Sequence, residues 1–149
     1  MTNPIEDILT NSQTVAIVGL SPNIKQDSYM VACYLSDHGY EIIPVNPTAT
    51  EILGRKSYAS LRDLPAPPDV VDIFRRAEYV PGIVEDAIAI GAKAVWMQLG
   101  VEHPAAAERA RAAGLKVVMN HCMKREHQRM SGHRVTATYK CRQEPPAAS

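Results

Sequence analysis

Apolar residues occur along this chain in short continuous runs separated by longer stretches of mixed character. Residues 15–18 form one such run, VAIV, which is typical of a strand buried on both faces of a parallel sheet. Further strands are predicted at residues 40–47, 70–74, 93–100 and 115–120. The apolar pattern therefore predicts five strands, and it leaves the segments between them to be assigned.

Most of those segments carry apolar residues at helical spacing. Helices are predicted at residues 4–10, from Asp27 or Ser28 to Gly39, at 80–91 and at 103–114, whereas residues 48–68 are expected to form only short helical turns. Strands that alternate with helices require right-handed crossovers and a parallel sheet. The predicted fold is α/β, a Rossmann-like, doubly wound, parallel five-stranded sheet in the order 3-2-1-4-5 with helices on both faces.

The length of 149 residues fits a single domain, which we place at residues 1–142. Residues 143–149 are small, polar or proline, and we expect a disordered tail there. The 16 basic and 16 acidic residues balance, so bulk charge favours neither a nucleic-acid nor an anionic membrane partner. Whether the chain forms a homo-oligomer or has a protein partner stays open.

The first residues show no signal-peptide pattern, and no apolar run is long enough to span a membrane. We therefore expect a cytoplasmic protein. Cys33, Cys122 and Cys141 are scattered without a CxxC spacing, which is typical of reduced thiols rather than of a disulfide framework.

Ligands of doubly wound sheets bind at the carboxyl ends of the strands, so the loop after the first strand is a candidate site. It begins at Gly19 and leads into a helix amino terminus, which attracts anions. Ser21, Asn23, Lys25 and Ser28 add the donor types that a diphosphate needs. The segment is interpreted as a phosphate-binding loop or, alternatively, as an ordinary turn with solvated side chains.

Two absences argue against an NAD-dependent dehydrogenase. Gly19 stands alone where a dinucleotide fingerprint has three glycines, and the second strand ends at Asn46 where an NAD site would place an acid for the ribose. Lys25 and Arg75 could nevertheless hold a 2′-phosphate. An NADP(H)-binding oxidoreductase therefore remains an alternative.

Four blocks of the chain resemble the stand-alone coenzyme A-binding proteins, which are akin to the coenzyme A-binding domain of succinyl-CoA synthetase α subunits. The blocks are VAIVGLSPN…DSYMVACYLSDHGYEIIPVNP, LGRKSYASLRDLP, VVDIFRR…VPGIVEDAIAIGAKAVWMQLGV and AAGLKVVMNHCMKREH. The resemblance implies coenzyme A or an acyl-CoA as a non-covalent ligand. By it, the phosphates would lie at Gly19, Leu20, Ser21, Asn23, Lys25 and Ser28, the adenosine at Val45, Asn46 and Pro47, and the opposite wall at Phe74, Arg75 and Val80.

Catalytic chemistry is less evident. No nucleophile and base stand together at the strand ends, so no catalytic residue is assigned and an enzyme is not expected. Gln98 is expected to hydrogen-bond an amide of the pantetheine. His121, Cys122 and His127 fit no standard metal-site spacing, and no metal is expected. Cys122 alone could act as a reactive thiol, which keeps a redox-regulatory role as a further alternative.

Overall fold

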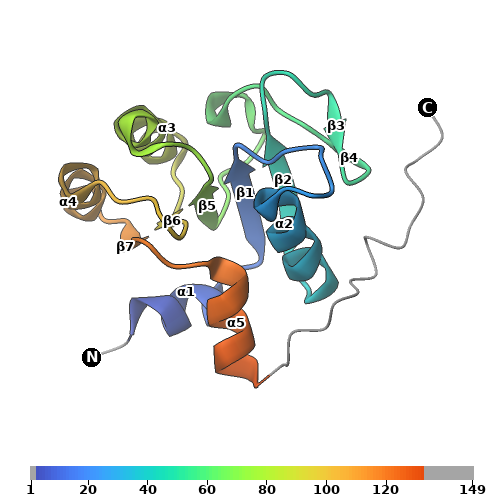
Figure 1. Cartoon of the computed structure of the whole chain (residues 1–149). Coiled ribbons are helices and arrows are strands. Elements are labelled where there is room, and N and C mark those ends of the chain that lie inside the picture. The colour runs from blue at the N-terminus through green and yellow to red at the C-terminus, as the bar shows by residue number, and fades with distance from the viewer. Residues whose placement is uncertain (1–2, 133–149) are drawn as a thin grey trace.

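The computed structural model describes residues 3–132 and is built around one parallel sheet of five strands (Figure 1). The strands are β1 (Thr14–Val18), β2 (Glu41–Val45), β5 (Val70–Ile73), β6 (Ala94–Met97) and β7 (Lys116–Val118). Every pairing among them is parallel. The predicted α/β fold with a Rossmann-like parallel sheet is confirmed.

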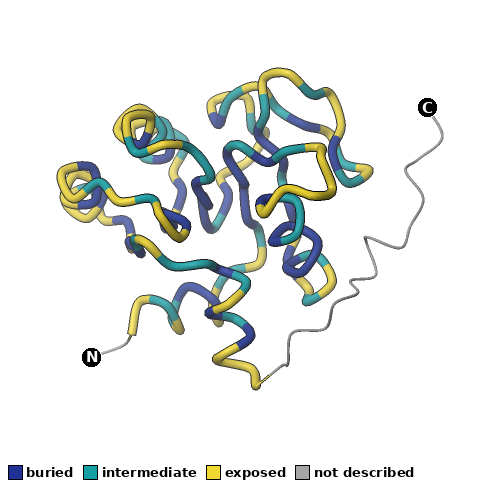
Figure 2. The backbone as a smooth tube through the Cα atoms, in the orientation of Figure 1, coloured by how far each residue is buried: buried dark blue, intermediate teal, exposed yellow. Residues whose placement is uncertain are grey.

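Helices cover both faces of the sheet, as predicted. One face carries α1 (Pro4–Asn11), α2 (Asp27–Asp37) and α5 (Met123–Ser131), and the other carries α3 (Val80–Ile90) and α4 (Pro104–Ala112). Each face has its own apolar core, and the buried parts of the tube follow the strands and the inner sides of the helices (Figure 2). The sheet therefore separates two cores. Because its strands are parallel, their carboxyl ends all lie at the same edge of the sheet.

The predicted strand order is wrong. The sheet runs β2-β1-β5-β6-β7, so the third of its strands in the sequence, β5, lies beside β1 and leaves β2 at the edge. Pro44 explains why, because proline has no N–H for a ladder and is confined to edge strands. The carbonyl of Pro44 accepts the N–H of Tyr58 on the side of β2 that faces away from β1. A further strand of the main sheet on that side would also need an N–H donor from residue 44, which proline lacks. β5, whose residues are all buried, takes the central position instead.

Residues 48–68 form more than short helical turns. A hairpin of β3 (Glu51–Ile52) and β4 (Arg55–Lys56) turns through Leu53 and Gly54, which both have positive φ. A short 3₁₀ helix, η1 (Leu61–Asp63), follows, and a second, η2 (Ala77–Tyr79), precedes α3. The expectation holds for η1, and the hairpin is an addition to it.

The last helix was not predicted. α5 begins where the side-chain oxygen of Gln98 accepts the N–H of Met123, a contact between segments far apart in sequence. The domain boundary at residue 142 and the expected tail at 143–149 lie outside the described residues. The expectation of reduced thiols is wrong for Cys33, which is disulfide-bonded, whereas Cys122 is a free cysteine.

Candidate functional site at the strand ends

Gly19 joins the ends of three strands. Its N–H donates to the carbonyl of Val45 at 3.0 Å, and its φ of +89° lies in the region that favours glycine. A Cβ at this position would lie 2.5 Å from the carbonyl oxygen of Phe74. The lone glycine of the first loop is therefore required by the close approach of β1 to the end of β5.

The first loop uses its polar side chains to hold itself together. The Ser28 hydroxyl accepts the N–H of Ser21, the Ser21 hydroxyl accepts that of Asn23, and the Asn23 side chain accepts that of Lys25. The first turn of α2 has no side-chain cap. Ser21, Asn23 and Ser28 thus act as acceptors inside the loop, and the helix amino terminus is the part left open to an anion.

Lys25 is exposed on this loop and forms no ion pair with any residue that the structure describes. It precedes the amino terminus of α2 by two residues, and its phosphate contact stays a prediction.

The corner after β2 is also internally bonded. The Asn46 amide donates to the carbonyl of Leu20 at 2.9 Å, and its oxygen accepts both the N–H and the hydroxyl of Thr48. Leu20 is 0% exposed and belongs to the core, while Val45 is buried and Pro47 is exposed. Asn46 therefore ties the corner to the first loop, and its side chain supplies no charge for a ribose.

A cavity of about 460 Å³ lies on one side of this junction, which we call the large cavity. Its walls come from the start of α2, the ends of β5 and β6, and the start of α5. Its lining residues are Asp27, Met30, Val31, Phe74, Arg75, Arg76, Gln98, Leu99, Gly100, Val101, Cys122, Lys124 and Arg125. Four basic residues face one acidic residue in this set, so the large cavity suits an anionic ligand.

A second cavity of about 360 Å³, the small cavity, lies on the other side of the junction. Val18, Val45 and Leu61 supply apolar wall, and Tyr79 supplies an aromatic ring. Arg75 lines both cavities. Its guanidinium carbon lies 4.5 Å from the centre of the Tyr79 ring, a cation–π distance.

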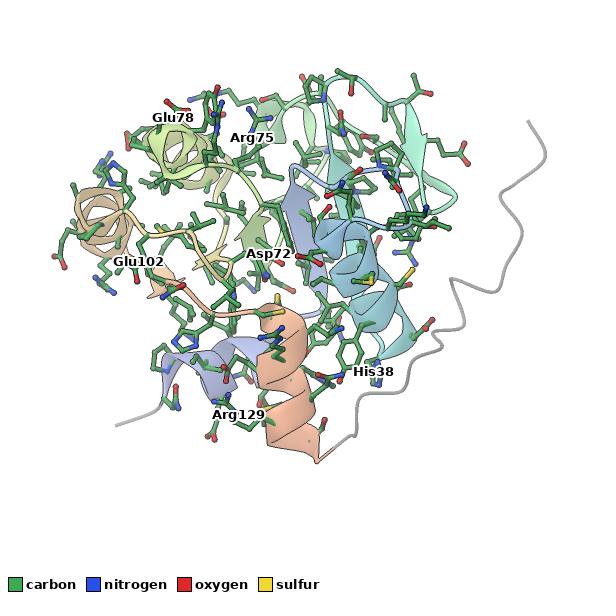
Figure 3. The ribbon with its side chains drawn as sticks, viewed as in Figure 1. His38, Asp72, Arg75, Glu78, Glu102 and Arg129 are labelled. Carbon is green, nitrogen blue, oxygen red and sulfur yellow. The ribbon has the colours of Figure 1, made fainter. Side chains whose placement is uncertain are left out.

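Arg75 and its neighbour differ in their charge partners. Arg76 forms an ion pair with Glu78 at 3.2 Å, whereas Arg75 has no carboxylate partner within the described part of the chain. Figure 3 shows Arg75 at the end of β5, close to the start of α3. Arg75 is therefore a cation that lines both cavities and has no carboxylate partner among the described residues.

Gln98 lies deep in the large cavity. Its side chain is 5% exposed, and its Oε1 accepts the N–H of Met123 at 3.0 Å. Its Nε2 has no hydrogen-bond partner among residues 3–132, and it is not one of the fully enclosed side-chain atoms. Because Gln98 lines the cavity, this NH₂ group is available to whatever binds there.

Of the residues expected at the opposite wall, Phe74 and Arg75 line the large cavity and Val80 does not. Val80 is fully buried at the start of α3, so its expected ligand contact does not match its place in the core. Two cavity residues, Lys124 and Arg125, were not assigned as ligand contacts from the sequence, although Lys124 ends the segment after the fifth strand that belongs to the strand ends. The basic cluster after the fifth strand, MKRE, was their signal, and only the unpredicted helix α5 places them at the cavity.

Cys122 occupies the N-cap position of α5, and it lines the large cavity. The two neighbouring histidines have other partners, because His121 Nδ1 lies 3.2 Å from Glu126 and His127 Nδ1 lies 2.7 Å from the Tyr34 hydroxyl. Within residues 3–132, no group of three or more histidine, cysteine or acidic side chains could hold a metal ion. Cys122 therefore stands as a thiol and not as part of a metal centre.

Asp72 is a buried carboxyl group that belongs to neither cavity. It is 0% exposed in β5, and neither side-chain oxygen has a hydrogen-bond partner among residues 3–132. Burial raises the pKa of Asp72 well above its ordinary value, and the nearby Ile73 amide only partly opposes this. The structure favours its neutral form.

Comparison with known proteins decides the family. A family model described as "CoA binding domain" matches residues 13–128. This chain belongs to the CoA-binding domain family. The resemblance found in the sequence is thereby confirmed at the level of the family.

The relatives of this CoA-binding domain are of two kinds. The uncharacterized protein YneT of Bacillus subtilis (strain 168) is 40% identical over 131 residues, which is 85% of this chain and 97% of YneT. A solved structure of a hypothetical protein from Pyrococcus horikoshii OT3 is 43% identical, with a TM-score of 0.84 over 88% of this chain and 94% of that one. Both are single small chains like this one.

The other kind is a large ligase. Acetate–CoA ligase (ADP-forming) II of Archaeoglobus fulgidus is 31% identical over 83 residues, which are 54% of this chain and only 12% of the ligase. The shared region is thus a small part of the ligase. No helix within residues 3–132 of this CoA-binding domain has the length and apolar character that a membrane span requires.

Proposed function

We propose that this protein binds coenzyme A, or an acyl-coenzyme A, non-covalently across the carboxyl ends of β1, β2, β5 and β6. The observation that carries the proposal is that Arg75, which has no carboxylate partner within residues 3–132, lines both cavities. Coenzyme A is itself bipartite, with a nucleotide and a pantetheine arm joined through a diphosphate. A ligand of that form fits two cavities with a phosphate site between them.

The diphosphate is assigned to the open amino terminus of α2, with Lys25 and Arg75 as counter-charges. The first-turn N–H groups of a helix and its partial positive charge favour an anion there. The loop hydrogen bonds of Ser21, Asn23 and Ser28 hold this terminus in place without occupying it. These three residues thus support the phosphate site by shaping the loop.

The adenosine is assigned to the small cavity and the pantetheine arm to the large one. Val45, Leu61 and Tyr79 offer the apolar and aromatic surface that a purine ring prefers. The large cavity ends at Gln98, whose free NH₂ suits a carbonyl oxygen of the arm. Asn46 and Pro47 shape the corner between the first loop and the small cavity.

An NADP(H)-dependent role is less well supported. The side chain of Asn46 is engaged by Leu20 and Thr48, and Asp86, the carboxylate that lines the small cavity, is paired with Arg62 at 2.7 Å. Neither is poised to hold a ribose. We infer a ligand-binding protein that acts as a carrier or sensor of coenzyme A rather than a nicotinamide enzyme.

Isothermal titration calorimetry tests this proposal. The purified chain is titrated with coenzyme A, 3′-dephospho-coenzyme A, NADPH and NAD. We expect coenzyme A to bind at micromolar concentration and the dephospho form to bind more weakly, because it lacks one phosphate for the cations. Heat with NADPH but none with coenzyme A at tens of micromolar protein would reject the proposal.

A further inference from the structure

The inner wall of the large cavity brings together a thiol and a hydrogen-bond donor from different parts of the fold. Cys122 occupies the N-cap position of α5 without a side-chain cap hydrogen bond, and Gln98 follows β6 and accepts the N–H of the very next residue, Met123. Both side chains line the cavity. The hydrogen bond therefore fixes the orientation of Gln98 relative to the residue that carries the thiol.

The orientation of the Gln98 amide follows from its partner. A backbone N–H needs an acceptor, so the atom facing Met123 is the oxygen and the NH₂ group is directed elsewhere. A donor without a partner on a residue that lines a cavity can meet an acceptor when a ligand binds. A carbonyl oxygen is the acceptor that this donor fits best, and an acyl thioester carries one next to its sulfur.

We propose that Cys122 accepts the acyl group of an acyl-coenzyme A bound in the large cavity, a step that rests on the proposed function. The thiolate of Cys122 attacks the thioester carbon, and the carbonyl oxygen becomes an oxyanion that receives a hydrogen bond from Gln98 Nε2. The bond between carbon and the coenzyme A sulfur then breaks. Coenzyme A leaves as a thiolate, which takes up a proton, and Cys122 has given its own proton to solvent.

This exchange balances without any further reactant. One thioester forms as another breaks, so no oxidant, metal or nucleotide is consumed. The basic side chains Arg75, Lys124 and Arg125 line the same cavity and oppose the negative charge that builds up on the oxyanion and on the leaving sulfur. The product is a protein that holds the acyl group on Cys122, which gives the carrier role a chemical form.

The experiment incubates the full chain with acetyl-coenzyme A and follows the intact mass and the free coenzyme A. We expect one acetyl group per chain, mapped to Cys122 by peptide mass spectrometry and removed by hydroxylamine, with coenzyme A released in equal amount. Cys122→Ser should take up no acetyl group, and calorimetry with coenzyme A measures how much binding this cavity variant retains. The same chain unfolded in urea gives the rate of an unassisted cysteine.

Gln98→Glu is the matched variant for the donor. A carboxylate keeps an oxygen for the Met123 N–H but removes the NH₂ group, so α5 retains its hydrogen bond. Acylation should slow by about tenfold or more, as when one oxyanion donor is lost. Alkylation of Cys122 by iodoacetamide forms no oxyanion, so the ratio of acylation to alkylation rates isolates the donor from changes in the thiol.

The outcomes separate the two proposals. If acetyl-coenzyme A binds while Cys122 stays unmodified, or is acylated no faster than in urea, the acyl-acceptor proposal is overturned and the binding proposal stands. If neither coenzyme A nor acetyl-coenzyme A binds, the binding proposal itself fails. An unchanged rate ratio in Gln98→Glu would remove the role of Gln98.

Discussion

The first loop with its β2 corner, and the large cavity, lie side by side at the strand ends but use polar residues in opposite ways. In the loop and corner, Ser21, Asn23, Ser28 and Asn46 are bonded to neighbouring backbone groups. In the large cavity, the Gln98 NH₂ has no hydrogen-bond partner and Arg75 has no carboxylate partner within the described residues. The first region stabilises the fold, and the second is left for a ligand.

The difference between the two regions shows that a polar residue close to a candidate ligand site need not itself contact the ligand. Hydrogen bonds already made inside the protein have to be broken before the same atoms can serve a ligand, which costs free energy. Substitutions in the loop and corner should therefore change mainly stability, whereas substitutions in the cavity should change mainly binding. Four predictions test this division, in order of decreasing effect.

Gly19→Ala should have the largest effect, because Gly19 holds both regions together. The added Cβ would lie 2.5 Å from a backbone oxygen, and φ is +89°. We expect the free energy of unfolding to fall by about 3–4 kcal/mol in urea denaturation, from the left-handed backbone and the clash combined. Gly114→Ala is the control, because its φ is +92° with nothing within 4 Å of the Cβ.

That control should lose only about 1 kcal/mol. Equal losses at the two glycines would show that the contact between the first loop and β5 contributes little.

Arg75→Met should weaken coenzyme A binding by about 10–100-fold in calorimetry, since a charge-assisted hydrogen bond to phosphate contributes about 1.5–3 kcal/mol. The free energy of unfolding should fall by no more than about 1 kcal/mol, because Arg75 loses its cation–π contact with Tyr79 but has no carboxylate partner to lose within the described part of the chain. Arg111→Met is the control. It removes an equal charge that is paired with Glu108 on α4, and the affinity should stay within about twofold.

Asp72→Asn tests whether a polar side chain without a hydrogen-bond partner among the described residues contributes to ligand binding even when it lines neither cavity. Because the pKa of Asp72 is raised above 3.8 on folding, the folded state binds more protons than the unfolded state above that pH. The free energy of unfolding therefore falls as the pH rises from about 4 toward the folded pKa. The amide does not ionise, so the variant avoids this loss.

We expect the Asp72→Asn variant to be more stable by about 2 kcal/mol at pH 7, with the gain shrinking toward zero near pH 3. Coenzyme A affinity should not change, since Asp72 lines neither cavity. Urea denaturation across pH and calorimetry at pH 7 measure the two effects. A gain that grew toward low pH would contradict the stated cause.

Asn46→Ala should have the smallest effect, a loss of about 1–2 kcal/mol in the free energy of unfolding from the lost bonds to Leu20 and Thr48. Coenzyme A affinity should fall by less than about threefold once the folded fraction is taken into account. A large loss of affinity without a loss of stability would place Asn46 with the ligand contacts and break the comparison.

Much of the fold could be predicted because its signals are local. The apolar runs of β1 and β5 and the helical spacing of α3 match the structure to within a residue or two. The strand order was not predicted correctly, although Pro44 carried a signal that β2 lies at an edge. α5 was missed because its start depends on Gln98, which is 25 residues away in the sequence.

The candidate site was predicted in part for the same reason. Gly19, Lys25, Arg75 and Gln98 lie at the strand ends as expected, because the carboxyl ends of parallel strands share one edge. Leu20 and Val80 turned inward to the core, and nothing in their local sequence separates an apolar wall from an apolar core. The contribution of Lys124 and Arg125 to the cavity lining follows only from the position of α5 in the structure.

The amino-acid sequence by itself determined the α/β class, the sheet edge that carries the candidate site and the family of the protein, because periodicity and motif spacing are properties of neighbouring residues. The tertiary structure alone decided which polar groups are already bonded and which remain free, because each hydrogen bond depends on a partner brought from elsewhere in the chain. Asn46 meeting Leu20, and Gln98 meeting Met123, are such pairings. One closes a corner of the fold, and the other leaves the NH₂ group of a cavity-lining residue without a partner among the described residues.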